Sequence, residues 1–460
     1  MERSIDDILA LLSHISNPSE KLKVIATLLK ISGDNQQLLS LGFDIIDTIH
    51  DDMERILSLL RLAIAVRDMD IELYKGLIQM AINGTEKIAN PKYKAMVLPD
   101  VAIEAVTFNE DLALKLIEEV LDLILRIDLR EDRIAAVMHL LETLLKSENI
   151  EGAIKVAEKI SDPYYKAIVF SEIGKVLAEA QIPLYSLMFS KALKSAAEID
   201  NMMTREITFG EVISRLAEAG EVDESLKLAE KLKVEDARMH VIESAFLGLL
   251  KKGDLSRISE LISMIKDRKR ISKLWALSVS TLMKEGYYEK VLEIINNITD
   301  PIHKDLALNN MSVALAEKGE FKKALLVVKH IKSSYFRGNA FSLIGLELFN
   351  KDVDGYNILF EKAIEEAENI DNVELRSKLF LNITLRLITV NFRDHLLEFF
   401  NRKNKNAEKS IKEGNLEKAA REYKEGLELS EIARLREYSE NFKEKIYEIR
   451  RKLVERIEVS

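Results

Sequence analysis

The chain has 460 residues, of which 47% are hydrophobic, 6% aromatic and 31% charged, and it contains no cysteine. This composition excludes disordered and collagen-like chains, and the lack of cysteine excludes a disulfide framework, a thiolate zinc site and a cysteine nucleophile. The formal charge is −10, but residues 401–460 hold 16 Lys and Arg against 13 Glu, which leaves 51 basic and 64 acidic side chains in residues 1–400. An acidic body of this kind disfavours binding to nucleic acid or to anionic lipid.

The sequence gives no sign of a membrane span. Its longest stretch without Asp, Glu, Lys or Arg is Ile8–Ser19, twelve residues, whereas a spanning helix needs roughly 20. The first residues, Met-Glu-Arg-Ser-Ile-Asp-Asp, lack the basic leader and apolar core of a signal peptide. We therefore expect a soluble, cytoplasmic protein, and its four Gln and high Lys and Glu content favour a thermophilic or archaeal source.

Several helix starts are marked by a capping residue followed by proline. The pairs are Asn17-Pro18, Asn90-Pro91, Asp162-Pro163 and Asp300-Pro301. Asn and Asp side chains accept hydrogen bonds from the first backbone N–H groups of a helix. Proline, which has no N–H group, is tolerated at the first helical position because an N–H there has no partner within the helix. Each pair therefore predicts the start of a helix.

Turn glycines recur at equal intervals along the chain, at Gly220, Gly253, Gly286 and Gly319. Each lies between two helical patterns, where glycine takes a positive φ without steric cost, so the unit is a helical hairpin. Extending the register, with some longer intervals, predicts further turns at Gly33, Asp68, Phe108, Glu148, Gln181, Asp352, Asn391 and Gly414. The interval from Asn391 to Gly414 is much shorter than the others, so the final hairpin is not expected to continue the register.

Two apolar columns support this register. Four residues before each turn from Glu148 to Asn391 stand Leu144, Leu177, Leu216, Leu249, Leu282, Leu315, Leu348 and Leu387. Eleven residues before the same turns stand Val137, Phe170, Phe209, Ile242, Trp275, Leu308, Phe341 and Phe380. The two columns are seven residues apart and share one helical face, which predicts that both, the lone Trp275 included, are core rather than ligand contacts.

A longer repeat overlies the hairpins. Residues Phe170–Gly174 and Tyr185–Asn201 recur, at one constant offset, as Phe341–Gly345 and Tyr356–Asn372. This spacing indicates that a block of five hairpins was duplicated. Repetition favours a binding surface over an enzyme, because an active site is asymmetric and occurs once.

The hairpin of about 33 residues, with a large apolar residue in its first helix, Leu seven residues later and Ala in its second helix, resembles the tetratricopeptide-like (TPR-like) superfamily of α-α superhelices. The best local match is Ala407, Gly414, Ala419, Tyr423 and Gly426, which is similar to the family's small–small–aromatic–small spacing. The resemblance covers most of the chain and is strongest over residues 130–430. It implies an extended concave surface that binds protein segments or holds a complex together.

The C-terminal residues differ in composition from the rest. Residues 401–406 (Asn-Arg-Lys-Asn-Lys-Asn) predict a polar break before a final hairpin. An amphipathic stripe then predicts one long helix, through Leu435, Tyr438, Phe442, Ile446, Ile449, Leu453 and Ile457. This helix would cap the open end of the solenoid or, since the stripe includes heptad-spaced positions, self-associate or dock a partner.

A basic column is the candidate binding feature. Fifteen residues before the turns stand Arg133, Lys166, Arg205, Arg238, Lys304, Arg337 and Arg376, and Lys94 and Arg270 lie one position to either side of that register. In one interpretation they are structural, as in the acid-first pairs Asp162–Lys166 and Asp300–Lys304. In the other, Lys166, Arg205, Arg238, Arg270, Lys304, Arg337 and Arg376 form a ladder that binds an acidic partner segment, and the run Lys266–Arg270 concentrates charge at its middle.

No catalytic or cofactor pattern is present in the sequence. The seven histidines form no His-x-x-x-His or His-Glu-x-x-His pair, and neither Gly-rich nucleotide-binding motif occurs. We expect no catalytic residue, metal or cofactor.

Together these patterns predict an all-α fold. Residues 1–400 would form a TPR-like α-α superhelix, with a weak register over 1–130 and a strong one over 130–400, and residues 401–460 would add a final hairpin and a capping helix, giving about twelve hairpins. The expected function is a non-catalytic scaffold or adaptor that binds a protein or peptide. Two alternatives are a regulatory solenoid that encloses a small molecule or peptide and, less favoured, an RNA-binding helical repeat.

Overall fold

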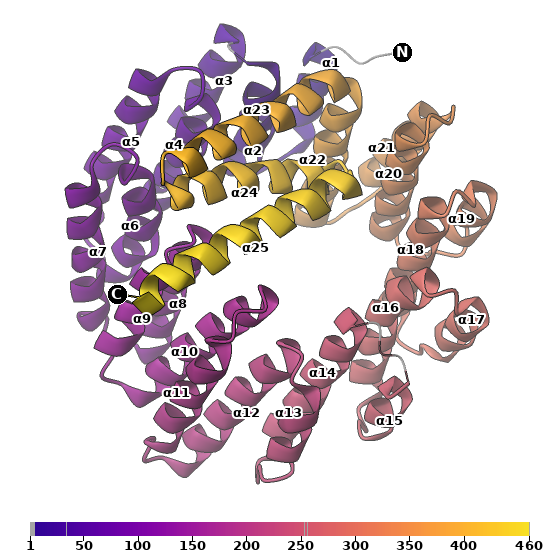
Figure 1. Cartoon of the computed structure of the whole chain (residues 1–460). Helices are drawn as coiled ribbons and strands as arrows, with labels where there is room; N and C mark the ends of the chain where they lie inside the picture. The colour runs from indigo at the N-terminus through magenta and orange to yellow at the C-terminus, as the bar shows by residue number, and fades with distance from the viewer. Residues whose placement is uncertain (1–4, 34, 253, 255, 460) are drawn as a thin grey trace. The chain divides into compact units, whose positions relative to one another are not determined.

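The computed structural model describes residues 5–33, 35–252, 254 and 256–459, and their regular structure is entirely helical. The chain divides into two compact units, with unit 1 made of Met1–Asn149 and Ile364–Ile449 and unit 2 made of Ile150–Ala363 and Arg450–Ser460 (Figure 1). None of the helices in the described ranges is long and apolar enough to cross a membrane.

Unit 1 combines the N-terminal helices with helices from the C-terminal part of the chain. Its elements are α1 (Ile5–Ala10), the 3-10 helix η1 (Leu11–His14), α2 (Pro18–Ser32), α3 (Gln36–Asp47), α4 (Asp52–Val66), α5 (Ile71–Thr85), α6 (Pro91–Ala105), α7 (Glu110–Leu125), α8 (Arg130–Lys146), α22 (Val373–Asn391), α23 (Arg393–Lys412) and α24 (Leu416–Ile432).

Unit 2 is a continuous run of helices. They are α9 (Ile150–Lys159), α10 (Pro163–Glu179), α11 (Tyr185–Ala197), α12 (Met202–Glu218), α13 (Val222–Ala229), α14 (Glu235–Lys252), α15 (Ile258–Ser263), α16 (Arg268–Lys284), α17 (Tyr288–Asn297), α18 (Pro301–Glu317), α19 (Phe321–Val328) and α20 (Ser334–Asn350). The division between the units falls within α21 (Tyr356–Glu368) and α25 (Arg436–Val459).

The helices alternate between two positions. We call the even-numbered helices α2 to α22 the A helices, and the helix that follows each of them its B helix. Within each unit an A helix packs against its own B helix and against the next A helix, as α12 does with α13 and α14. The all-helical, repeat-like architecture predicted from the sequence is therefore confirmed.

Eight of the predicted turns fall where the backbone is left-handed, and the predictions at Asp68 and Phe108 fall in turns without a positive φ. Positive φ angles occur at Gly33, Gly220, Gly286, Gly319 and Gly414 and, without glycine, at Glu148, Gln181 and Asp352. The last three are turns that only the register could predict. The prediction at Asn391 is wrong, because Asn391 is the last residue of α22, and Gly253 lies outside the described residues.

The proline-marked helix starts are confirmed. Helices α2, α6, α10 and α18 begin at the expected prolines, and the preceding Asn or Asp side chain accepts hydrogen bonds from backbone N–H groups of the first turn. All eight residues of the leucine column are buried. In the second column Val137, Phe170, Ile242 and Phe380 are buried and the other four are half-buried.

Trp275 belongs to the core, as its column predicts. Its ring is half-buried and packs edge to face on Phe246, with 6.3 Å between the ring centroids. It packs against two clusters of buried residues, one from α12 to α16 and one from α16 to α21. The same cation–π contact occurs in both copies of the duplicated block. Lys191 lies over the Phe170 ring in the first copy, and Lys362 lies over the Phe341 ring in the second.

The polar break expected at residues 401–406 does not exist. These residues lie inside α23, so the predicted boundary after residue 400 falls within a helix. Lys403 belongs to a buried face of α23 that also contains Leu396, Phe399, Phe400 and Ala407. The lysine is compatible with helix there because it is paired with buried carboxylates, as described below.

The amphipathic stripe of α25 is buried within the chain. Phe442, Ile446, Ile449 and Leu453 are buried, and Phe442 packs against Phe400 of α23 and Tyr423 of α24. The side chain of Ile457 lies outside the described residues. Ala407, Ala419, Tyr423 and Gly426, which carry the resemblance to TPR-like hairpins, are all buried.

Gly426 permits the close approach of α25, which gives a first prediction. An added Cβ would lie 2.5 Å from Cζ of Phe442, so Gly426→Ala should separate the helices and destabilise the protein by about 1–3 kcal/mol. Thermal and urea unfolding followed by circular dichroism measure the change. The control is Gly76→Ala in α5, where an added Cβ meets nothing within 4 Å and alanine should stabilise by about 0.5–1 kcal/mol. Equal stability changes in the two variants would contradict this packing.

Candidate functional site

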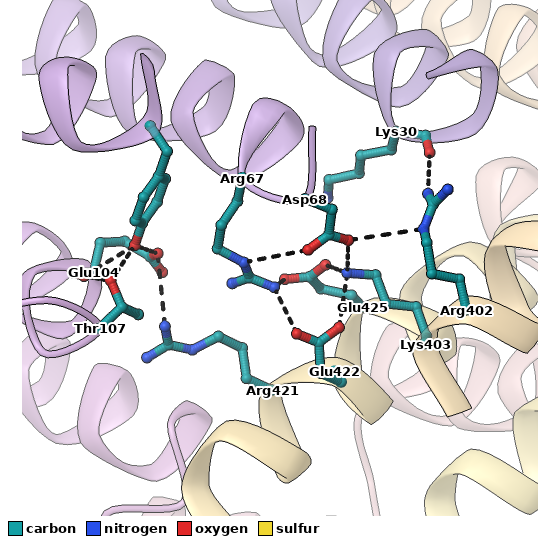
Figure 2. Close-up of polar contacts among 11 residues, drawn as sticks. Lys30, Arg67, Asp68, Glu104, Thr107, Arg402, Lys403, Arg421, Glu422 and Glu425 are labelled. Carbon is teal, nitrogen blue, oxygen red and sulfur yellow. Dashed lines mark hydrogen bonds and ion pairs between the residues drawn. The ribbon is translucent and has the colours of Figure 1, made fainter. Parts of the chain in front are cut away.

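Unit 1 contains a cluster of buried charges between α4 and the pair α23–α24. We call Arg67, Asp68, Lys403, Glu422 and Glu425 the ion cluster (Figure 2). Arg67 and Asp68 follow the last residue of α4, Lys403 comes from α23, and the two glutamates lie one turn apart on α24. The cluster thus joins segments that are far apart in the sequence.

Short contacts connect all five side chains. The ammonium group of Lys403 lies 2.7 Å from Asp68, 2.9 Å from Glu422 and 2.7 Å from Glu425, and its side chain is only 1% exposed. Arg67 Nη2 donates to Glu425 Oε1 at 2.7 Å and to Glu422 Oε1 at 3.3 Å. Arg402, 3.9 Å from Asp68, supplies a third cation to balance the three carboxylates.

These contacts keep Glu425, Lys403 and Arg67 in their charged forms. Burial alone would raise the pKa of Glu425, but the charges of Arg67 and Lys403 outweigh it and hold that pKa far below its ordinary value. Burial would lower the pKa of Lys403, yet Glu425 and Glu422 raise it. The pKa of Arg67 is likewise raised, because four carboxylates outweigh the effect of burial.

Basic side chains extend the contact along the ends of three A helices. Arg402 donates to the carbonyl of Lys30 at the end of α2 (3.0 Å), Arg421 to Ile103 near the end of α6 (3.2 Å), and Lys424 to Leu145 near the end of α8 (3.3 Å). Lys424 also pairs with the buried Glu148. Cations suit these positions because the last carbonyls of a helix lack intrahelical partners and carry partial negative charge.

Arg421 leads to a second polar group around Tyr74. The Tyr74 hydroxyl donates to Glu104 and contacts Thr107, and Arg421 lies 3.9 Å from the Glu104 carboxylate (Figure 2). Burial and the charge of Glu104 raise the pKa of Tyr74, so this hydroxyl stays protonated as a donor. The arrangement pairs charges and fixes helices, and we assign it a structural role.

Removing Lys403 should loosen α23 and α24, which is the second prediction. Lys403→Met leaves three carboxylates around Arg67, and breaking a buried ion pair in this way costs about 3–5 kcal/mol. Hydrogen exchange measured by mass spectrometry should show faster exchange of the backbone amides of α23 and α24 in this variant. The control is Lys409→Met on the same helix, since Lys409 is exposed and lies 3.9 Å from Glu413, and exposed pairs contribute at most about 1 kcal/mol. A similar loss in both variants would show that the cluster is not what holds these helices.

The depressed pKa of Glu425 gives a third prediction, on acid stability. A carboxylate whose folded-state pKa lies below its unfolded value of 4.5 stabilises the fold above pH 4.5 and loses this contribution as the pH falls further. The melting temperature of the wild type should therefore fall between pH 5 and pH 3 more steeply than that of Glu425→Gln, which cannot titrate. Glu413→Gln, at an exposed pair, should keep the wild-type pH dependence. Parallel curves for the wild type and Glu425→Gln would contradict the cluster's role in acid stability.

The basic column lies half-buried in the structure rather than on an open surface. Four of its arginines donate to the carbonyl of the isoleucine six residues earlier, which lies two or three residues after the end of the preceding B helix. These bonds are Arg133 to Ile127, Arg205 to Ile199, Arg337 to Ile331 and Arg376 to Ile370. Lys166 donates to the Glu158 carbonyl, Lys94 pairs with Glu119, and Arg270 pairs with Glu243.

The acid-first pairs expected from the sequence do not form. Asp162 and Asp300 instead accept hydrogen bonds from backbone N–H groups at the starts of α10 and α18. Asp267 does the same for α16, within the run Lys266–Arg270. The side chains of Arg238 and Lys304 make no hydrogen bond or ion pair with the residues that the structure describes.

A groove of about 710 Å³ lies beside Lys304 in unit 2. Helices α17, α18 and α19 form it. Buried apolar side chains such as Ile295, Ile298 and Met311 line it, as do the exposed Leu292 and Leu326. The charged and polar side chains that also line it are Asn296, Thr299, Lys304, Asp305, His330 and Lys332. No group of three or more His, Asp or Glu able to hold a metal ion occurs among the described residues.

Neither the ion cluster nor the groove was predicted from the sequence. Lys403 lies at helical spacing between Phe399, Phe400 and Ala407, so a lysine within an apolar stripe was an available signal for a buried charge. No local pattern pointed to its partner Asp68, which is distant in the sequence. The groove combines residues of three helices and depends on their packing, although Lys304 itself was among the predicted contacts.

Comparison with known proteins shows similarity at low identity. No protein-family model matches the chain, and no curated protein sequence matches it. Two solved structures similar to it are Ton1535 from Thermococcus onnurineus NA1, at 18% identity, and a circular tandem repeat protein with novel repeat topology and enhanced subunit contact surfaces, at 14%. The first match covers 78% of this chain and 97% of that protein with a TM-score of 0.26, and the second covers 97% and 98% with a TM-score of 0.12.

Proposed function

We propose that the protein is a non-catalytic scaffold, a TPR-like α-α superhelix of about twelve hairpins that binds a segment of a partner protein. The observation that carries the proposal is the groove between α17, α18 and α19. Its walls are largely apolar, and it lies on helices that also expose large hydrophobic side chains.

Exposed apolar side chains border the groove. Leu292 and Leu326 line the groove and are 52% and 58% exposed, and Ile302, next to the lining residue Pro301, is 67% exposed. Grouped exposed apolar side chains beside a concavity are typical of interaction sites. Because Leu292 and Leu326 leave the groove open to solvent, it suits a polypeptide better than the enclosed small molecule of the sensor alternative.

The contacts of α23 and α24 in unit 1 support the proposal. There the A helices already hold a helical pair of the same chain, through cations at helix ends and through the ion cluster. Hairpins of this kind can therefore bind a helical segment laid against them, and a scaffold would use the same capacity toward a second protein. RNA binding remains the weaker alternative, since the chain is acidic and the basic column mainly contacts its own backbone.

A capture experiment tests this proposal, and its outcome is the fourth prediction. Tagged protein would be incubated with lysate and cross-linked, and the captured proteins identified by mass spectrometry. We expect a discrete protein partner that Leu292→Glu/Leu326→Glu loses, because glutamate adds charge to the apolar walls. The control Leu187→Glu/Ile358→Glu places the same charges on exposed apolar positions of α11 and α21 and should retain it.

Each other outcome has a definite meaning. Failure of the wild type to capture any protein would overturn the scaffold and favour the sensor, which a ligand screen by thermal shift would then examine. Equal capture by both double variants would leave a scaffold whose contact surface is not this groove.

A further inference from the structure

Two hairpin junctions of unit 2 can be compared directly, because their helices correspond residue for residue. The bounds of α17 and α18 follow those of α9 and α10 by the same offset at all four ends. Both A helices begin with Asp-Pro, and the column residues Lys166 and Lys304 occupy the same position. Differences between the two junctions therefore reflect side chains rather than register.

At the first junction the chain supplies its own acid. Lys166 donates to the carbonyl of Glu158 on α9, and the Glu158 carboxylate lies 2.8 Å from Lys191 of α11. The hydrogen bond from Lys191, with the charges of Lys191 and Lys166, lowers the pKa of Glu158. An acidic group is thus fixed between the B helices beside the column lysine.

At the second junction that acid is missing. The residue equivalent to Glu158 is Asn296, which is neutral and lines the groove next to Lys304. Asp305 cannot replace it, because its two carboxylate oxygens accept hydrogen bonds from the backbone N–H groups of Lys332 and Ser333, at 3.1 and 2.8 Å. Among the described residues, the ammonium groups of Lys304 and Lys332 have no acidic partner.

We propose that the groove between α17, α18 and α19 binds an acidic, aliphatic segment of a partner protein. A carboxylate of the segment pairs with Lys304 and Lys332, in the place that Glu158 occupies at the first junction. Its aliphatic side chains lie between Leu292 and Leu326 over Ile295, Ile298 and Met311. This assignment rests on the proposed scaffold function and adds to it the chemistry of the partner.

The fifth prediction concerns peptide selection. Random dodecapeptides displayed on phage would be selected on the wild-type protein, and the enriched peptides synthesised with a fluorescein label. We expect enrichment of sequences that combine Asp or Glu with Leu, Ile or Val, and their affinity, measured by polarisation, should fall as NaCl is raised from about 50 to about 500 mM.

Single substitutions then locate the binding. Asn296→Glu restores the internal acid of the first junction and should weaken binding about tenfold or more, because the new carboxylate competes for Lys304. Lys304→Gln should weaken it by a similar factor. The matched control is Lys166→Gln, at the equivalent position whose junction already contains an acid, and it should bind like the wild type.

The Asn296→Glu variant retains both lysines, and the glutamate that it introduces is the residue found at the equivalent position, Glu158. It should therefore fold, which circular dichroism checks. Enrichment of basic or neutral peptides, or no enrichment, would overturn the proposal. Equal affinity for wild type and Asn296→Glu would also overturn it. A protein partner in the capture experiment that Asn296→Glu retains would leave the scaffold standing while excluding this chemistry.

Discussion

The carbonyl groups at helix C-termini set the main constraint on this molecule. An α-helix leaves its last four carbonyls without intrahelical partners, and a chain built from helical hairpins has many such ends. Left-handed turn residues satisfy some of them, and the column arginines bind carbonyls that lie two or three residues beyond the ends of B helices. In unit 2, Lys252 and Lys318 donate to carbonyls of the preceding hairpin, at Gly220 and Met283. In unit 1, side chains of α23 and α24 donate to carbonyls at the ends of A helices. Many of the cations of this acidic chain therefore bind its own backbone.

This constraint also explains three of the basic residues after residue 400. Arg402, Arg421 and Lys424 meet the ends of α2, α6 and α8, where the negative ends of the helix dipoles favour positive charge. The ion cluster adds selectivity to these contacts. Arg67 and Asp68 lie at the end of α4, and only an alignment that brings Lys403, Glu422 and Glu425 to them leaves no buried charge unpaired. A shift by one helical turn would strand several charges, so the cluster specifies one alignment even if an apolar contact would be equally stable.

Features determined by neighbouring residues could be predicted from the sequence, and features determined by distant ones could not. The turns at Glu148, Gln181 and Asp352 and the Asp-Pro helix starts follow from short-range patterns and from the repeat itself. Residues 401–406 are all polar, which favours a break when they are judged locally, whereas Lys403 is stabilised in a helix by Asp68 from a distant segment. The prediction of acid-first ion pairs was wrong because the same aspartates have a second local role. Asp162 and Asp300 can either pair with a lysine or cap a helix, and the unsatisfied N–H groups of the first turn take the carboxylate.

The same repeat position can therefore be structural in one hairpin and available in another. Arg205, Arg337 and Arg376 are committed to carbonyl groups of their own chain, and Lys166 has Glu158 beside it. Lys304 occupies the same column, but Asn296 replaces the acid, and the neighbouring Leu292 and Leu326 remain exposed. A purely structural role would leave no reason for the loss of the acid to coincide with exposed apolar walls. The neutral Asn296 and the exposed leucines both fit the occupant proposed above, a segment that brings its own carboxylate and its own aliphatic side chains.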